Sequence, residues 1–476
     1  MERHSTISQL GSSHACQLFV PFRPSRYPQR IGGKQKGAFC EQRLHDAAGY
    51  SVKAQKLASP GKADRIERDA GHSASSSGID AQGAVAVPDF TPLRNGSGPR
   101  TWPKKAEIYI VRTDGMSCSR ETVRASGCLS FAHPSTQQQL LVWRERPRCV
   151  LVLKKLGDEQ WDSYLRVLRY LGKEEDMRVV VEPHEYLKLS QQTDLNFVDT
   201  YNHDEAGRLH QHVDFVVCLG GDGTILHASS LFQRAIPPVV SFSAGSLGFL
   251  TNLSLQSVED DLRAVIYGCE DLDQCSIEEE MRGVHITLRM RLECRIVRQN
   301  QSDNTPQELY EVLNEVVVDR GANPYLAKIE CWERDTLITK VQADGVMLAT
   351  PTGSTAYSVA AGGSMVHPNV PAILFTPICP HSLSFRPVVL PDYAELELRI
   401  PGDARCPAWV CFDGKQRQEL QRGDAVRVRM STNPVPTISK MDQTRDWFGS
   451  LERCFGWNDR AEQKPLGYID RTDGCS

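Results

Sequence analysis

The stretch DFVVCLGGDGTILHASSLF, residues 214–232, decides the fold of this chain. Its first part, DFVVCL (214–219), is a short apolar run typical of a buried strand, and it leads directly into the five residues GGDGT (220–224). An apolar helix, ILHASSLF (225–232), is predicted to follow at once. A buried strand that turns through glycines into a helix is typical of parallel sheets covered by helices.

The residues on both sides of this stretch repeat the same alternation. CVLVLKK (149–155) and MRVVVEP (177–183) predict two earlier buried strands, and PVVSFS (238–243) predicts a later one. Between the first two strands, five apolar residues have the spacing of one helix face: Trp161, Tyr164, Leu165, Leu168 and Leu171. Strands that alternate with helices predict a doubly wound, Rossmann-like α/β domain with parallel strands.

The sequence changes character after about residue 253. The later part contains apolar runs rich in β-formers, several with alternating polarity and with Pro and Gly between them. These runs are GVHITLRMRLECRIV (283–297), YEVLNEVVVD (310–319), AELELRI (394–400), AWVCFDG (408–414) and AVRVRM (425–430). They predict a mainly β, sandwich-like second domain.

Four segments are therefore expected along the chain. Residues 1–98 are predicted to be a disordered tail, because their Ser/Gly stretches bury too little apolar surface to offset the cost of ordering. Residues 99–252 should form the α/β domain, with 102–142 as an extended lead-in, and 253–434 the β-rich domain. Residues 435–476 should hold an amphipathic helix at DWFGSLERCFGWN (446–458), packed back on the body, and a short tail.

The composition excludes several classes of protein. The formal net charge of -4 gives the chain no overall positive charge that would attract nucleic acid. The sequence contains no run of about 18 apolar residues, so no membrane-spanning helix is predicted. The 15 cysteines include no CxxC pair, so neither a zinc site nor a disulfide framework is predicted. We expect reduced core cysteines and a cytosolic protein. Organelle targeting stays open, because residues 1–60 hold nine Lys/Arg and three Asp/Glu.

The GGDGT loop is the first candidate site. Its glycines let the backbone approach a phosphate closely, and the helix that follows offers free N–H groups to an anion. Asp222 would lie at the carboxyl end of a strand, where open α/β sheets bind ligands. Its charge would repel a phosphate, which favours a general base for a hydroxyl or a metal contact over a binding role. The alternative is a tight turn in which the aspartate caps the helix.

Two later segments place polar side chains among apolar ones. Asn314 and Glu315 interrupt the run VLNEVVVD (312–319); they would meet one ligand if the strand bends or ends there, or they lie solvated at an edge. ADGVMLATPTGSTAYSVAAGG (343–363) collects small hydroxyl side chains beside Tyr357, which suits a nucleoside or the cap of a helix beginning near residue 356. Asp344 is either a ligand contact or a turn residue.

The order of these motifs resembles the NAD kinase family, and its animal cytosolic branch in particular. The motifs are GGDGT, GSLGFLT (245–251), NE (314–315), DGVMLATPTGSTAY (344–357), PHSLSFRPVVLP (380–391) and FDGK (412–415). The likeness covers roughly residues 100–460. It implies an enzyme that transfers phosphate from ATP, with Mg²⁺ or another divalent metal, to the 2′-hydroxyl of the adenosine ribose of NAD, giving NADP. Asp222 would accept the proton of that hydroxyl.

The resemblance also implies the remaining site residues and the assembly. Gly220, Gly221, Gly223 and Thr224 would bind the phosphates of ATP. NAD would contact Asp222, Gly223, Asn314, Glu315, Asp344, Thr355, Ala356, Tyr357, Ser358, Val359 and Ala360. No residue is assigned as a metal ligand, and a homo-oligomer, a dimer or tetramer with shared sites, is expected.

Four other residues need an interpretation. Ser243 and His227 depart from what is usual in the animal members of the family. His381 and Lys415 could serve as an acid–base group and a phosphate ligand, but we interpret them as a structural loop residue and a solvated turn residue. A lipid kinase, which shares only the GGDG element, and a dinucleotide sensor without turnover are the alternatives to an NAD kinase.

Overall fold

The computed structural model describes residues 102–113, 118–123, 129, 138–243, 245, 247–268, 283–299, 308–440 and 442–460. All of them belong to one compact unit. The predicted N-terminal tail and its targeting alternative lie outside the described residues, as does the chain beyond residue 460. Within the described part of the chain, no helix is long and apolar enough to span a bilayer.

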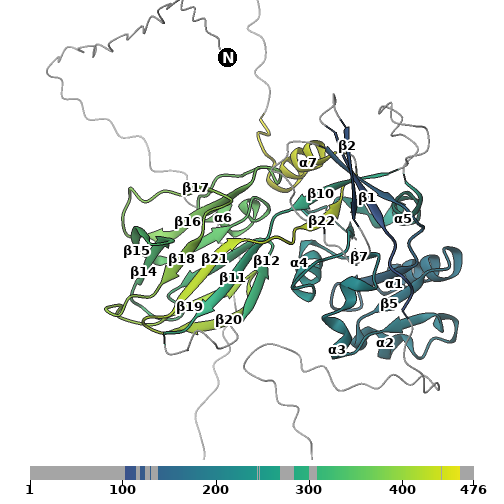
Figure 1. Ribbon diagram of the computed structural model, residues 1–476, viewed down its shortest axis with the longest axis horizontal. Coiled ribbons are helices and arrows are strands. Elements are labelled where there is room, and N and C mark those ends of the chain that lie inside the picture. Colours follow the sequence, from purple (N-terminus) through teal and green to yellow (C-terminus); the bar gives the residue numbers. More distant parts are fainter. Residues whose placement is uncertain are drawn as a thin grey trace, which may run out of the picture. The chain divides into compact units, whose positions relative to one another are not determined.

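The predicted α/β domain is confirmed, and its strands are parallel (Figure 1). The strand order is β8-β7-β4-β5-β6, and every residue of β4, β7 and β8 is buried, as expected for strands covered on both faces. The strands are β4 (Cys149–Lys154), β5 (Arg178–Val181), β6 (Val198–Thr200), β7 (Phe215–Leu219) and β8 (Val239–Ser243). The helices are α1 (Trp161–Arg169), α2 (Pro183–Leu189), α3 (His203–Ala206), α4 (Asp222–Leu231) and α5 (Val258–Tyr267).

Helix α1 illustrates how the sequence pattern produces this packing. Four of the five apolar residues on its predicted face are buried, while Trp161 packs at the margin of the core: the buried ones are Tyr164, Leu165, Leu168 and Leu171. Polar residues occupy the opposite face, so the helix buries one stripe against the sheet.

The expected extended lead-in proves to be part of the same sheet. It forms three antiparallel strands, β1 (Ile108–Thr113), β2 (Cys118–Val123) and β3 (Gln138–Trp143). Two strands from far along the chain, β10 (Val284–Arg289) and β22 (Val435–Ile438), lie between β3 and β8. A short strand, β9 (Leu253–Ser254), pairs with β8. Alternating apolar residues alone do not reveal which strands pair, because pairing is decided by distant parts of the chain.

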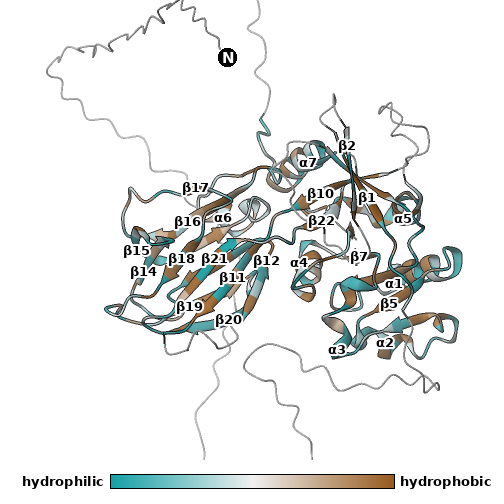
Figure 2. Cartoon of the chain, viewed as in Figure 1, coloured by the Kyte–Doolittle hydropathy of each residue, from teal (hydrophilic) through white to brown (hydrophobic). Residues whose placement is uncertain are grey.

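The second sheet is antiparallel throughout the described residues and packs around its own hydrophobic core. Apolar residues gather on its strands in Figure 2. The strands are β11 (Leu292–Val297), β12 (Leu309–Val312), β13 (Glu315–Asp319), β14 (Ala327–Glu333), β15 (Thr336–Ala349), β16 (Ala372–Pro380), β17 (Val388–Pro391), β18 (Leu396–Arg399), β19 (Ala408–Phe412), β20 (Lys415–Leu420) and β21 (Ala425–Met430).

The chain passes from the first sheet to the second at residues 290–291, between β10 and β11. This crossing comes later than the boundary expected at residue 253, and it divides the run 283–297 between the two sheets. The first sheet also keeps α5, whose apolar face joins its core. The run 283–297 looks uniform in sequence because both halves are β-strands with one buried face.

The amphipathic pattern near the C-terminus forms α7 (Gln443–Phe455), which begins three residues before the predicted helix. The Asp442 side chain caps its N-terminus, and Gly456 ends it in the left-handed conformation that glycine adopts without strain. Leu451 is buried, and the Ser450 hydroxyl donates to the Gly248 carbonyl at 3.1 Å. Helix α7 therefore rests on the loop that follows β8.

Candidate active site

The glycine loop is shorter than the sequence indicates, because helix α4 already begins at Asp222. Gly221 is its N-cap residue, so Asp222 occupies the first helical turn. Gly220 has a φ of +153°, and a Cβ built there would lie 2.3 Å from the Thr224 hydroxyl oxygen. Thr224 itself is buried. Glycine is therefore required at residue 220 for backbone conformation and packing within the protein. The Thr224 side chain faces the protein interior and not the surface of the loop.

The Asp222 carboxylate does not cap its own helix. Its Oδ2 accepts from the backbone N–H of Phe249 at 3.0 Å, and its Oδ1 accepts from the N–H of Leu250 at 3.1 Å and the Thr251 hydroxyl at 3.1 Å. These donors all come from the GSLGFLT segment, to which the sequence assigned no chemical role. The three bonds hold the carboxylate in one orientation at the carboxyl end of β7. The helix-cap alternative for Asp222 is therefore wrong.

Gly248 makes this arrangement possible. A Cβ built at Gly248 would lie 2.2 Å from Oδ1 of Asp222 and 2.8 Å from Oγ1 of Thr251. A side chain at residue 248 would therefore displace the carboxylate from its three donors. In the sequence, the second glycine of GSLGFLT, Gly248, was the only sign that this segment packs closely against Asp222.

With Asp222 as the general base expected from the sequence, we predict that Gly248→Ala lowers the rate of the expected phosphoryl transfer by roughly 10- to 100-fold, because a small displacement of a catalytic group has an effect of that size. Gly245→Ala is the matched control, since a Cβ at that residue meets nothing within 4 Å. Steady-state rates of the two purified variants test the prediction. Equal rates for both variants would show that the position of Asp222 does not depend on Gly248.

Asn314 and Glu315 lie where the apolar run breaks. Strand β12 ends at residue 312 and β13 begins at residue 315, so Asn314 lies in a bend between two strands and Glu315 is the first residue after that bend. The Asp413 carboxylate holds this bend by accepting from the N–H groups of Leu313 at 2.7 Å, Asn314 at 2.8 Å and Glu315 at 3.1 Å. Of the two alternatives, a broken strand rather than a solvated edge is observed, because Glu315 is buried. Asp413, in the FDGK motif, is a structural residue that the sequence did not single out.

Burial and the neighbouring Asp413 raise the pKa of Glu315 to about 8. Its Oε2 atom is buried without a hydrogen-bond partner among the described residues. At neutral pH the side chain is therefore mainly a carboxylic acid, which can donate a hydrogen bond to a ligand oxygen or nitrogen.

This raised pKa predicts a dependence of stability on pH. Below the unfolded-state pKa of 4.5, Glu315 is protonated in both states and contributes nothing. As the pH rises from 4.5 to 8, only the unfolded chain loses the proton, so the free energy of unfolding falls, by a total on the order of a few kcal/mol. Urea unfolding at pH 5 and pH 8 should show this fall in the wild type and a smaller one in Glu315→Gln. Parallel pH profiles would contradict it.

The PTGSTAY segment lies against the same bend. It forms a 3₁₀ turn over residues 352–355 and a single helical turn, α6 (Tyr357–Ala360), close to the helix start expected near residue 356. The Thr350 hydroxyl donates to the Leu313 carbonyl at 2.6 Å, and the Thr350 N–H donates to the Asn314 carbonyl at 2.9 Å. A Cβ at Gly353 would lie 2.1 Å from the Asn314 carbonyl oxygen. Residues 313–315 and 350–354 therefore form one closely packed structure.

The predicted dinucleotide residues of this segment differ in their accessibility. Tyr357 and Ala360 are exposed, and Thr355, Ala356 and Val359 are half-buried. Ser358 is buried, and its hydroxyl is hydrogen-bonded to that of Thr376, so its side chain faces the core. The tyrosine ring is the most accessible of them.

Asp344 is not a turn residue. It lies within strand β15 and forms an ion pair with Nε of Arg320 at 2.7 Å. The pKa of Tyr357 is raised by partial burial and then by Asp319, Cys379, Asp344 and Glu315, so all four lie close enough to act on the ring. Glu315 and Asp344 lie near opposite ends of the β13–β15 pairing, in which Glu315 is opposite Ala349 and Asp319 is opposite Gly345.

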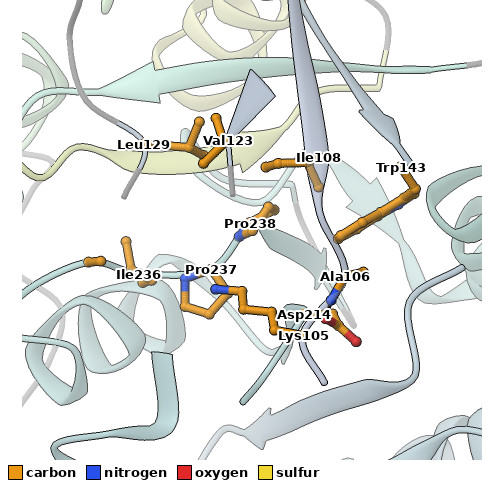
Figure 3. A pocket seen from close by; sticks show the side chains of 11 residues that line it. Lys105, Ala106, Ile108, Val123, Leu129, Trp143, Asp214, Ile236, Pro237 and Pro238 are labelled. Atoms are coloured by element: carbon orange, nitrogen blue, oxygen red, sulfur yellow. Dashed lines mark hydrogen bonds between the residues drawn. The ribbon is translucent and has the colours of Figure 1, made fainter. Parts of the chain in front are cut away.

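A small pocket elsewhere contains none of the predicted site residues. It lies between β1 and residues 235–238, and Figure 3 shows Asp214 and Lys105 on one side and Val123 and Leu129 on another. The Asp214 carboxylate accepts from the N–H groups of Ala106, Arg148 and Cys149, which places it in a structural role at the start of β4.

Two family models match this chain. The ATP-NAD kinase N-terminal domain matches residues 149–269, and the ATP-NAD kinase C-terminal domain matches residues 313–440. The chain belongs to the ATP-NAD kinase family. The first match contains Asp222 and its donors, and the second contains the bend at Asn314 and the PTGSTAY segment.

Similar proteins within the ATP-NAD kinase family include some from plants and yeast. The chain is 58% identical to "NAD kinase 2, chloroplastic" of Arabidopsis thaliana over 363 residues, 76% of this chain and 36% of that protein. It is 45% identical to "ATP-NADH kinase YEF1" of Saccharomyces cerevisiae over 267 residues, 54% of this chain and 51% of the yeast protein. The chain thus spans about a third of its plant relative. These relatives do not support the expected likeness to the animal cytosolic branch.

The fold is also that of a solved relative. A crystal structure of yeast NADH kinase, complexed with NADH, superimposes with a TM-score of 0.60 at 29% identity. The superposition covers 71% of this chain and 96% of the yeast chain. It confirms the order of an α/β domain followed by a β-sheet domain.

The residues that depart from the usual family pattern have structural partners here. His227 contacts Oε1 of Glu182 through Nε2 at 2.7 Å, and the Ser243 hydroxyl accepts from the Gly245 N–H at 3.2 Å. His381 and Lys415 are both exposed, and His381 donates its backbone N–H to the Gln342 carbonyl. Of the eight cysteines whose side chains the structure describes, four are buried and none forms a disulfide.

Proposed function

We propose that this chain transfers the γ-phosphoryl group of ATP to the 2′-hydroxyl of the adenosine ribose of NAD, in the presence of a divalent metal, and so forms NADP. The observation that carries the proposal is the Asp222 carboxylate, held by Phe249, Leu250 and Thr251 at the start of α4. Family membership supports the same reaction. Lipid phosphorylation is disfavoured, because it has no use for the PTGSTAY segment.

Asp222 is suited to accept the hydroxyl proton. Its Oδ1 already receives two hydrogen bonds, whereas Oδ2 receives one, from the Phe249 N–H. Because a carboxylate oxygen has two lone pairs, Oδ2 keeps one for the hydroxyl of a substrate. The oriented carboxylate then accepts the proton as the hydroxyl oxygen attacks phosphorus.

The glycines beside Asp222 support a phosphate site. A Cβ at Gly221 or Gly223 would meet no protein atom within 4 Å, so neither glycine is needed for packing. Both flank the N-terminus of α4, a helix of ten residues whose free N–H groups and dipole favour an anion. We propose that the phosphates of ATP approach the backbone at these two residues, while Gly220 and Thr224 shape the loop from within.

The dinucleotide would lie along Asn314, Glu315, Asp344 and Tyr357. Glu315 offers a buried carboxyl oxygen without a partner, and Tyr357 offers an exposed ring on which a base or nicotinamide can stack. Asp344 is partly exposed beside Arg320 and can accept from ribose hydroxyls.

The metal fits this arrangement as a partner of the substrate. The described residues contain no group of three His, Cys, Asp or Glu side chains that could hold an ion. Mg²⁺ commonly binds through one or two carboxylates together with substrate phosphates and water, and Asp222 lies between the two glycines of the proposed phosphate site. When bound, the metal would neutralise charge on the polyphosphate.

A homo-oligomer is proposed from an exposed apolar edge. Among the described strands, β17 pairs with β16 alone, and it exposes Val388 and Val389 beside a loop that exposes Leu383. An unpaired apolar edge strand is a ready surface for a second copy of the chain. Light scattering of the purified protein tests this, and a monomer at micromolar concentration would contradict it.

The compartment is tested separately. The name of the plant relative places that protein in the chloroplast, whereas the reduced cysteines suit the cytosol. We propose the cytosol for the full chain, and imaging of a C-terminal fluorescent fusion in plant cells tests it. Fluorescence confined to chloroplasts would contradict it.

The reaction is tested by incubating the purified chain with ATP, Mg²⁺ and NAD and measuring NADP with an NADP-specific dehydrogenase. We expect NADP to form, and to cease forming when EDTA removes the metal. Sphingosine and diacylglycerol in place of NAD give the control for a lipid kinase. Dinucleotide binding without NADP formation would instead indicate a sensor.

A further inference from the structure

Arg289 is a buried cation for which the proposed phosphoryl transfer has so far required no role. It is the last residue of β10, pairs with Val435 of β22, and is only 6% exposed. The hydrogen-bond partners that the described residues offer it are neutral groups, and Asp222 and Asp446 act on it electrostatically. An unpaired buried charge is costly, so its presence requires a compensating function.

The contacts of Arg289 join the two halves of the proposed site. Its Nη2 donates to the carbonyl of Phe249, the residue whose N–H holds Asp222, at 3.4 Å. Its Nη1 donates at 3.5 Å to the hydroxyl of Thr352, in the PTGSTAY segment. Its Nε donates to the Thr437 hydroxyl at 3.0 Å, which anchors the guanidinium to β22.

We propose that Arg289 is a positioning residue for phosphoryl transfer: its guanidinium fork holds the loop that orients Asp222 against the turn that carries the dinucleotide-binding residues. The inference rests on the proposed NAD kinase reaction and deepens it. Asp222 follows β7 of the first sheet and Thr352 follows β15 of the second, so the sugar hydroxyl reaches the carboxylate only if these parts keep a fixed separation. The guanidinium places its donors on three nitrogens in fixed directions and so reaches acceptors on three separate segments, whereas a lysine ammonium presents all its donors from one nitrogen.

The positive charge of Arg289 suits a location near the proposed phosphate site. Burial lowers the pKa of Arg289 to about 10, and the group remains a cation at neutral pH. The polyphosphate would bring several negative charges to the neighbouring start of α4, where a buried cation acts through a low dielectric. The charge therefore costs stability in the resting protein and is offset when the anionic substrate binds.

The test compares Arg289→Met, Arg289→Lys and Thr352→Val with the wild type. We expect both arginine variants to lower kcat by about 10- to 100-fold with KM for NAD changed by less than about threefold, because the substrate still binds but is misaligned. Thr352→Val should act in the same direction. The double variant Arg289→Met with Thr352→Val should be no slower than Arg289→Met, because both changes break one bridge.

Arg291→Lys is the control for a structural role, since Arg291 is also buried but, among the described residues, contacts Glu311 and backbone carbonyls, two of them at the C-terminal end of α4, the end opposite to Asp222. It should lower the melting temperature while the folded protein keeps its kcat. Wild-type kcat in Arg289→Lys, or additive losses in the double variant, would overturn the role of Arg289. If the wild type forms no NADP, both the proposed function and this inference fail.

Discussion

Asp222→Asn should lower the rate of NADP formation by about 10²- to 10⁴-fold, the usual contribution of a general base. The asparagine amide cannot accept the hydroxyl proton. Its NH₂ group would replace one carboxylate oxygen and would face a backbone N–H donor instead of accepting from it. In the wild type, Oδ1 and Oδ2 both accept from backbone donors, from Leu250 and Phe249 respectively. The measurement is kcat with saturating ATP and NAD, together with NAD affinity by calorimetry.

Thr251→Val is the matched control for this prediction. It removes the hydroxyl that donates to Oδ1 of Asp222 at 3.1 Å, but it leaves the carboxylate and its two backbone donors. We expect a far smaller loss of rate than in Asp222→Asn. A near-normal rate for Asp222→Asn would refute the assignment of the base, because an uncharged amide would then suffice.

The largest effect on stability is expected at Arg291. Arg291→Met should lower the free energy of unfolding by about 3–5 kcal/mol, the usual result of removing one partner from a buried charged network. The guanidinium is fully buried and donates to four backbone carbonyls, while Glu311 lies 3.6 Å from Nε. The carbonyls belong to Asn433 at 2.7 Å, Phe232 at 2.8 Å, Ser229 at 3.4 Å and Arg234 at 2.5 Å.

The location of these carbonyls explains the size of the effect. Those of Ser229 and Phe232 belong to the last turn and the C-cap of α4, where carbonyls have no partner within the helix. Arg291 therefore fastens the far end of the helix that carries Asp222 to the second sheet. Its removal leaves buried acceptors unsatisfied and Glu311 without its cation, and the pKa of Glu311 is already raised to about 7 by burial.

Urea unfolding measures the loss of unfolding free energy in Arg291→Met, and a surface variant, Arg427→Met, serves as the control. Arg427→Met removes a residue from an exposed ion pair with Glu397 and should cost less than about 1 kcal/mol. The double variant Arg291→Met with Glu311→Gln should recover part of the loss, since the orphaned charge is gone. A change below about 1 kcal/mol for Arg291→Met alone would show that the network contributes little.

Local patterns were sufficient for much of the fold. The strand, glycine and helix order around residues 214–232, the apolar face of α1 and the parallel strands β4, β5, β7 and β8 all follow from residues close in sequence. The membership of β1, β10 and β22 in the same sheet could not be predicted in this way. Their partners lie far away in the chain, and strands of either sheet show the same alternation.

The same division applies to the site. By itself, the sequence determined which residues can do chemistry, because a carboxylate among glycines, a polar pair in an apolar run and a cluster of small hydroxyls are local patterns. Only the tertiary structure decided that Phe249, Leu250 and Thr251 orient Asp222, that Asp413 bends the chain at Glu315, and that Arg289 spans the two sheets. The reason is that hydrogen bonds and buried charges select their partners by proximity in space, and a sequence records only proximity along the chain.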